Sequence, residues 1–157
     1  MFKSRRKFIK SIVSLTAYSL TMASGLLHSS LVHAQWLNES FKATNYEQLL
    51  QHLFVDVEFI DSRKIKFQRL PRVAENGAVV PIKITSSLEN VSKISLLVEK
   101  NPHPLIAEFY FSAKMEPSVT ARFKMAEASA VIVIIEADGK FYRKSKYVKV
   151  TVGGCGG

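Results

Sequence analysis

The chain has 157 residues, of which 47% are hydrophobic and 22% are charged, and its formal net charge is +9. This length fits one domain with a hydrophobic core and argues against two independent domains. Because the sequence contains a single cysteine, it excludes an internal disulfide and a zinc site built from paired cysteines.

The first 34 residues have the pattern of an export signal. Five basic residues precede residues 11–34, which contain no Asp, Glu, Lys or Arg. Among the basic residues, Arg5 and Arg6 form a pair like that of the twin-arginine signal, which exports folded proteins. Serines and threonines dilute the uncharged stretch, so a cleaved signal fits better than a permanent membrane anchor. We therefore predict a twin-arginine signal peptide over residues 1–34 and a periplasmic mature chain that begins at Gln35.

Charge beyond the signal is modest. Residues 1–34 hold five of the 22 basic residues and none of the 13 acidic ones, so cleavage would leave a net charge of +4. Without a basic helix or a long run of like charges, this predicts no nucleic-acid partner. Five cations on the last predicted strand are expected to form a solvated sheet face, or alternatively to attract anionic substrates: Lys140, Arg143, Lys144, Lys146 and Lys149.

Residues 35–62 are predicted to form an N-terminal segment with one short helix. Within residues 45–53, Tyr46, Leu49 and Leu53 follow the spacing of an amphipathic helix, and Asn45 is available as its N-cap. This helix is expected to pack against the main domain.

Residues 63–152 alternate apolar and polar side chains with period two, the pattern of half-buried strands. The predicted strands cover residues 64–68, 80–85, 94–98, 105–111, 119–125, 131–135 and 141–152. Turn signals separate them at residues 75–77, 101–102, 116–117 and 138–139, and Asp138-Gly139 is the best hairpin signal. Seven short strands without long helices predict an all-β fold, an antiparallel sandwich of immunoglobulin-like architecture.

One predicted strand is apolar on both faces. Residues 130–135 read AVIVII, so one face is expected to pack in the sandwich core and the other beneath something else. Either the N-terminal helix or a partner subunit would provide that cover.

The chain ends with one thiol among four glycines. Cys155 is flanked by Gly153, Gly154, Gly156 and Gly157, and neither packing nor capping explains such an ending. Glycine has wide backbone freedom and no side-chain bulk, so residues 153–157 are predicted to form a flexible arm that can enter a narrow cleft. Fully extended, such an arm would carry the sulfur roughly 10 Å beyond the last strand.

A thiol on such an arm fits a carrier that holds a substrate covalently, and three other interpretations of this ending compete with that one. The thiol could be an incidental feature of a frayed terminus, although an exposed free cysteine is a hazard in an oxidising compartment. An exported immunoglobulin-like binding module could use Cys155 for an intermolecular disulfide. A terminal Gly-Gly also occurs in ubiquitin-like sulfur donors, but the export signal and the strand pattern argue against that cytoplasmic chemistry.

The tail resembles the signature end of the SoxY family, the sulfur-carrier subunits of bacterial thiosulfate-oxidising systems. Residues 71–81 (PRVAENGAVVP), 99–104 (EKNPHP) and 138–140 (DGK) also resemble characteristic stretches of that family, and the likeness covers roughly residues 45–157. The resemblance implies that Cys155 is the carrier cysteine and that the four tail glycines form its swinging arm.

The resemblance further implies the working context. It implies a heterodimer with a SoxZ-like sandwich subunit and transient docking with a c-type cytochrome enzyme, a sulfate-releasing hydrolase and a sulfane dehydrogenase. The chain would hold sulfur intermediates on its thiol and catalyse none of the steps itself. We accordingly expect no catalytic residue, no metal and no cofactor other than the covalent sulfur adduct.

Overall fold

The computed structural model describes residues 40–154, which contain helical residues at 40–42, one helix of two turns that is described from end to end, and nine strands. The helix is α3 (Tyr46–Leu53), and the strands follow in the order β1 (Phe59–Asp61), β2 (Ile65–Gln68), β3 (Val73–Asn76), β4 (Val80–Ser86), β5 (Val91–Val98), β6 (Leu105–Tyr110), β7 (Ser118–Phe123), β8 (Ser129–Ala137) and β9 (Lys140–Val152). The predicted signal peptide, with Arg5 and Arg6, lies outside the described residues.

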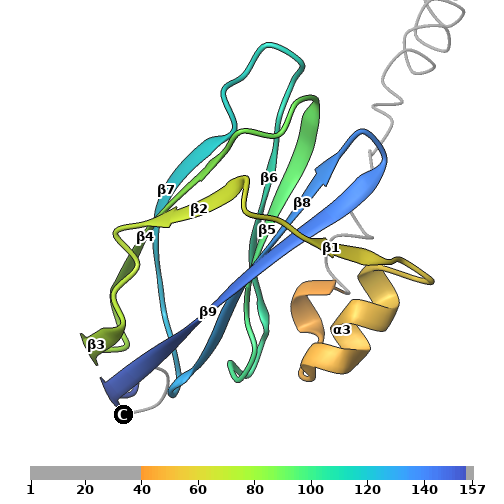
Figure 1. The fold of residues 1–157 in the computed structure, drawn as a ribbon. Coiled ribbons are helices and arrows are strands. Elements are labelled where there is room, and N and C mark those ends of the chain that lie inside the picture. Colours follow the sequence, from red (N-terminus) through yellow and green to blue (C-terminus); the bar gives the residue numbers. More distant parts are fainter. Residues whose placement is uncertain (1–39, 155–157) are drawn as a thin grey trace, which may run out of the picture. The chain divides into compact units, whose positions relative to one another are not determined.

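Two sheets face each other (Figure 1). The larger has the order β1-β9-β8-β5-β6, with β3 added beside β9, and the smaller has the order β2-β4-β7. The central pairs are antiparallel, whereas β1 and β3 both pair in parallel with β9. The predicted all-β sandwich is therefore confirmed.

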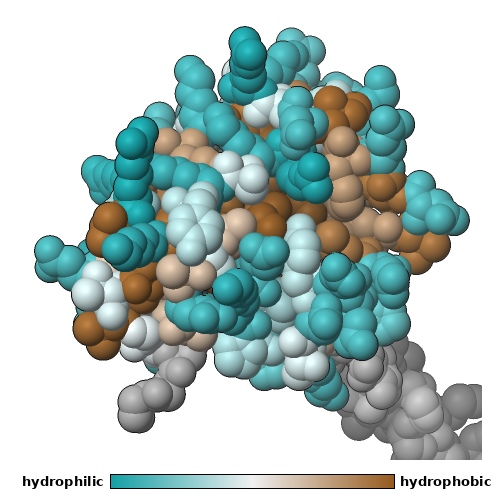
Figure 2. Space-filling model, turned by 60° about the horizontal axis from the view of Figure 1, so that its bottom comes forward, coloured by the Kyte–Doolittle hydropathy of each residue, from teal (hydrophilic) through white to brown (hydrophobic). Residues whose placement is uncertain are grey.

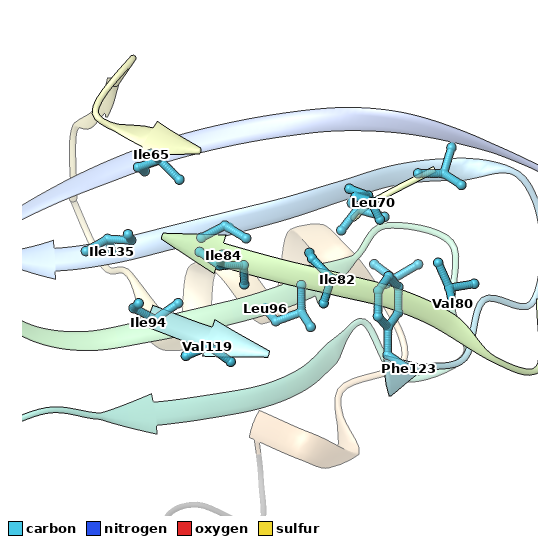
Figure 3. Close-up of a cluster of buried hydrophobic side chains, with 14 of the residues drawn as sticks. Ile65, Leu70, Val80, Ile82, Ile84, Ile94, Leu96, Val119, Phe123 and Ile135 are labelled. Atoms are coloured by element: carbon cyan, nitrogen blue, oxygen red, sulfur yellow. The ribbon is translucent and has the colours of Figure 1, made fainter. Parts of the chain in front are cut away.

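The main core fills the space between the two sheets. Alternate residues of the facing strands point into it, as the labelled side chains in Figure 3 show. Ile82 and Ile84 of β4 and Ile94 and Leu96 of β5 are fully buried there. Burial of apolar surface contributes about 25 cal/mol per Å², so this cluster stabilises the packing of the two sheets.

Helix α3 covers the opposite face of the larger sheet. Leu49 is fully buried and shares a second cluster with Phe54, Leu97, Ile132 and Ile134. The odd-numbered residues 131, 133 and 135 of β8 pack in the main core, so β8 is buried on both faces. The sequence left open whether the N-terminal helix or a partner subunit covers this strand, and the structure shows the helix there.

Local signals account for the helix start and for the last hairpin. The Asn45 side chain accepts a hydrogen bond of 2.8 Å from the Glu47 N–H, which makes Asn45 the predicted N-cap. Asp138 and Gly139 have φ of +51° and +67°, the two positive angles that a type I′ turn between β8 and β9 requires.

Two short strands were not predicted from the sequence. β1 has three residues and β3 has four, and each lies beside a different part of β9. Because β3 pairs with the last residues of β9, both strands finish at the same end of the sandwich (Figure 1).

Candidate functional site

The last strand brings the chain to the predicted arm. β9 ends at Val152, and Gly153 and Gly154 are the last residues that the structure describes. Cys155, Gly156 and Gly157 lie outside the described residues, so the carrier cysteine itself stays a prediction. The site that can be built from the structure is the base of the arm, Gly153 and Gly154, and its surroundings.

A turn after β3 contacts the end of β9. The Gly77 N–H donates a hydrogen bond of 2.7 Å to the Val152 carbonyl, and the Gly77 carbonyl accepts one of 2.8 Å from the Met125 N–H. The Asn76 side chain accepts a 2.7 Å bond from the Ala78 N–H, which shapes the turn. Gly77 thus joins the end of β9 to the segment that follows β7.

The arm base packs against these same backbones. The Gly154 N–H donates a 2.8 Å hydrogen bond to the Met125 carbonyl. A Cβ atom on Gly153 would collide with the Ala126 carbonyl oxygen, and one on Gly154 would collide with the backbone of Gly77 and Ala78. At both glycines it is close backbone contact that excludes a side chain.

Asn101 holds the segment on which the arm base rests. This residue is 7% exposed; its Nδ2 donates a 2.7 Å bond to the Lys124 carbonyl, and its Oδ1 accepts a 2.8 Å bond from the Ala126 N–H. A buried amide with both ends satisfied fixes the backbone it bridges. From the sequence, Gly77 and Asn101 are expected in turns and in stretches that resemble the family, but with no role at this site.

An open hollow of about 790 Å³ lies next to this segment. Its lining comes from the start of α3, from residues 99–102 and from Ala126 and Glu127. Lys100 lies 3.8 Å from the Glu127 carboxylate, and both side chains are more than half exposed. Burial raises the pKa of Tyr46 in this hollow, Arg143 opposes the rise and Glu99 adds to it.

The molecular surface at this end is mixed. Figure 2 views the molecule from below, and small groups of hydrophobic side chains alternate there with hydrophilic ones. Val73, Val79 and Val152, which belong to β3, to the turn after it and to β9, are each more than half exposed.

The cations of β9 mostly have structural partners. Lys144 Nζ donates a 2.5 Å bond to the Ile65 carbonyl, and Lys146 Nζ donates a 2.6 Å bond to the Leu70 carbonyl. Arg143 Nε lies 3.3 Å from the Asp61 carboxylate. These contacts join β1 and the segment that follows it to β9, so the solvated sheet face expected for the five cations is wrong for Lys144 and Lys146.

Within residues 40–154, no group of three or more His, Cys, Asp or Glu side chains could hold a metal ion. In the same range, no helix combines the length and the hydropathy of a membrane-spanning segment.

The fold and the site define a two-sheet β-sandwich with one helix on an outer sheet face and a last strand that leads into a glycine-rich terminus. The superoxide reductase (neelaredoxin) from Ignicoccus hospitalis shares this architecture, with a TM-score of 0.50 over 56% of this chain and 80% of that chain. Its sequence identity is 16%, so the likeness concerns the fold alone.

The family model described as sulfur oxidation protein SoxY matches residues 50–155. The solved structure of the sulfur carrier protein SoxY from Chlorobium limicola f thiosulfatophilum is 31% identical, with a TM-score of 0.62 over 73% of this chain and 99% of that chain. The chain therefore belongs to the SoxY family. No curated protein sequence matches it.

Proposed function

We propose that this protein is a covalent carrier of sulfur intermediates in periplasmic thiosulfate oxidation, with the Cys155 thiol as the point of attachment. The observation that carries the proposal is the family match, which extends to residue 155 and thus includes the one cysteine of the chain. The name of the Chlorobium relative, a sulfur carrier protein, supports the same role.

Attachment is an oxidation. Thiosulfate and the Cys155 thiol join through a new S–S bond, giving Cys–S–S–SO₃⁻, one proton and two electrons. A partner c-type cytochrome enzyme accepts the two electrons. Because the thiolate is the nucleophilic form of cysteine, loading depends on deprotonation of Cys155 in that enzyme's site.

Release of the first product is a hydrolysis. Water cleaves the bond between the sulfane sulfur and the sulfonate group, giving sulfate, two protons and a persulfide anion, Cys–S–S⁻, on Cys155. A partner hydrolase catalyses this step, and a sulfane dehydrogenase then oxidises the remaining sulfur. The carrier supplies no catalytic residue and no cofactor; it keeps the intermediate attached, which raises its effective concentration at each enzyme in turn.

Assembly and export complete the proposal. The carrier pairs with a SoxZ-like sandwich subunit, and the complex leaves the cytoplasm folded, guided by Arg5 and Arg6 of the twin-arginine signal. The glycine-rich terminus brings the thiol to the docked enzymes.

The test is Cys155→Ser in the purified system of carrier, partner subunit and enzymes. We expect loss of thiosulfate-dependent turnover with an unchanged circular dichroism spectrum, because Cys155 follows the folded strands. A matched control combines Cys155→Ser with Thr151→Cys, which places an exposed thiol on β9 instead of the arm. Turnover retained by Cys155→Ser would refute the carrier role, and loss of function on reduction of an intermolecular disulfide would favour the binding module.

A further inference from the structure

Two of the family-like stretches, residues 71–81 and 99–104, have no part in the proposed chemistry. The structure brings one residue of each to the base of the arm. Gly77 contacts the arm base directly, and Asn101 acts through the backbone of residues 124–126.

The surroundings of Gly77 leave no room for a side chain. Among the described glycines only Gly139 has a positive φ, so Gly77 does not need glycine for its backbone conformation. A Cβ atom on Gly77, however, would lie 2.9 Å from the Gly154 nitrogen and 3.0 Å from Val150 Cγ1, and would collide with the Met125 carbonyl oxygen. Two of these three neighbours are backbone atoms, which cannot rotate away as a flexible side chain would.

Met125, which binds the Gly154 N–H, is itself held in place by several contacts. Met125 is fully buried in the main core, its N–H bonds to Gly77 and its carbonyl accepts the Gly154 N–H. Asn101 binds the carbonyl before Met125 and the N–H after it. The Met125 carbonyl is therefore held in place by the core, by Gly77 and by Asn101 together.

We propose that Gly77 and Asn101 are positioning residues for the Cys155 thiol: together with Met125 and Ala126 they form a socket that fixes Gly153 and Gly154. This inference rests on the proposed carrier role of Cys155. The socket thus extends the fixed part of the chain from the end of β9 to Gly154.

The socket changes the reach of the thiol. A free arm from Val152 would place three residues between the strand and the sulfur, whereas an arm fixed at Gly154 leaves one, roughly 3.5 Å of chain. An enzyme that acts on the cargo must then approach the end of the sandwich where β3 and β9 finish. Ordering two residues in advance also removes part of the entropy cost of docking.

The single cysteine allows a direct test without any enzyme. A nitroxide attached to Cys155 reports its motion by electron paramagnetic resonance, and amide hydrogen exchange reports the Gly154 N–H. In the unaltered protein we expect the Gly154 amide to exchange at least about tenfold more slowly than in an unstructured peptide. In Gly77→Ala we expect that protection to be lost and the nitroxide lines to narrow. Asn101→Ala should also lower the protection of the Gly154 amide and narrow the nitroxide lines. Asn101→Asp should have a smaller effect on both, because its side chain still accepts the hydrogen bond from the Ala126 N–H.

The matched control is Gly139→Ala. Gly139 has φ of +67° and no atom within 4 Å of an added Cβ, so alanine there strains the hairpin without touching the arm. We expect this variant to lose stability and keep the nitroxide spectrum and Gly154 protection of the unaltered protein. An unprotected Gly154 amide in the unaltered protein would overturn the socket, even if Gly77→Ala failed to fold.

Different results would refute the socket and the carrier role. If Cys155→Ser retained turnover, the carrier role would be wrong, whereas the exchange and resonance results would still decide whether the arm base is fixed. If Cys155→Ser were inactive and Gly77→Ala matched the unaltered protein in exchange, line shape and turnover, the socket would be refuted and the carrier role would stand.

Discussion

Replacing Leu49 by alanine tests whether α3 is the true cover of the larger sheet. Leu49 is fully buried, and its cluster includes Leu97 of β5 and Ile132 and Ile134 of β8. Large-to-small substitutions of this kind cost about 2–5 kcal/mol, because buried contacts are lost and a cavity is left. We expect a loss of about 3 kcal/mol in the free energy of unfolding. For a domain of this size that corresponds to a fall of roughly 10–15 °C in Tm.

The assay is thermal or urea unfolding of the purified protein followed by circular dichroism. Gln51→Ala provides the control, because Gln51 is exposed on the same helix and alanine preserves helix propensity. A loss below about 1 kcal/mol for Leu49→Ala, similar to that of Gln51→Ala, would refute the reasoning. It would mean that the outer face of β8 is covered in solution by something other than α3.

Three further predictions concern single side chains. Ser129 Oγ is buried without a hydrogen-bond partner among the described residues, so Ser129→Ala should raise the free energy of unfolding by about 1 kcal/mol, measured by urea titration; a loss would contradict this. Lys146→Met keeps the apolar stem but leaves the Leu70 carbonyl unpaired, so the amides near residue 70 should exchange faster while those of β8 do not. Since burial raises the pKa of Tyr46 above its ordinary value of 10.0, the folded protein keeps that proton at a pH where the unfolded chain loses it, and stability should fall as the pH rises above 10. Tyr46→Phe should reduce this slope in alkaline unfolding curves, and an unchanged slope would contradict the assignment.

Features set by neighbouring residues were predictable from the sequence. The Asn45 cap, the Asp138-Gly139 turn and the alternation within β4 each depend on a few adjacent residues, and the structure confirms all three. The apolar run of β8 indicated burial on both faces, because alternate side chains of a strand point to opposite sides.

Features set by distant contacts were not predictable. β1 and β3 are too short for a periodic pattern and exist because β9 offers them a free edge. The roles of Lys144 and Lys146 depend on carbonyls almost 80 residues earlier, so their charge alone gave the wrong expectation.

The site likewise combines residues that the sequence alone singles out with residues whose role depends on distant contacts. Cys155 and its glycines stand out in the sequence because a lone thiol in such a setting has no structural explanation. Gly77 and Asn101 look like ordinary turn residues, because their importance arises only when residues 125–126 and 153–154 come beside them.

Intact-mass measurement of the purified protein tests the central claim most directly. After incubation with thiosulfate and the c-type cytochrome enzyme, we predict that one thiosulfate group is added in place of the Cys155 proton, and that the hydrolase then shortens this adduct to a persulfide. The Cys155→Ser protein should gain no mass under the same conditions. An unchanged mass of the unaltered protein, or an adduct that persists in the Cys155→Ser variant, would contradict a carrier whose cargo is held on the terminal thiol.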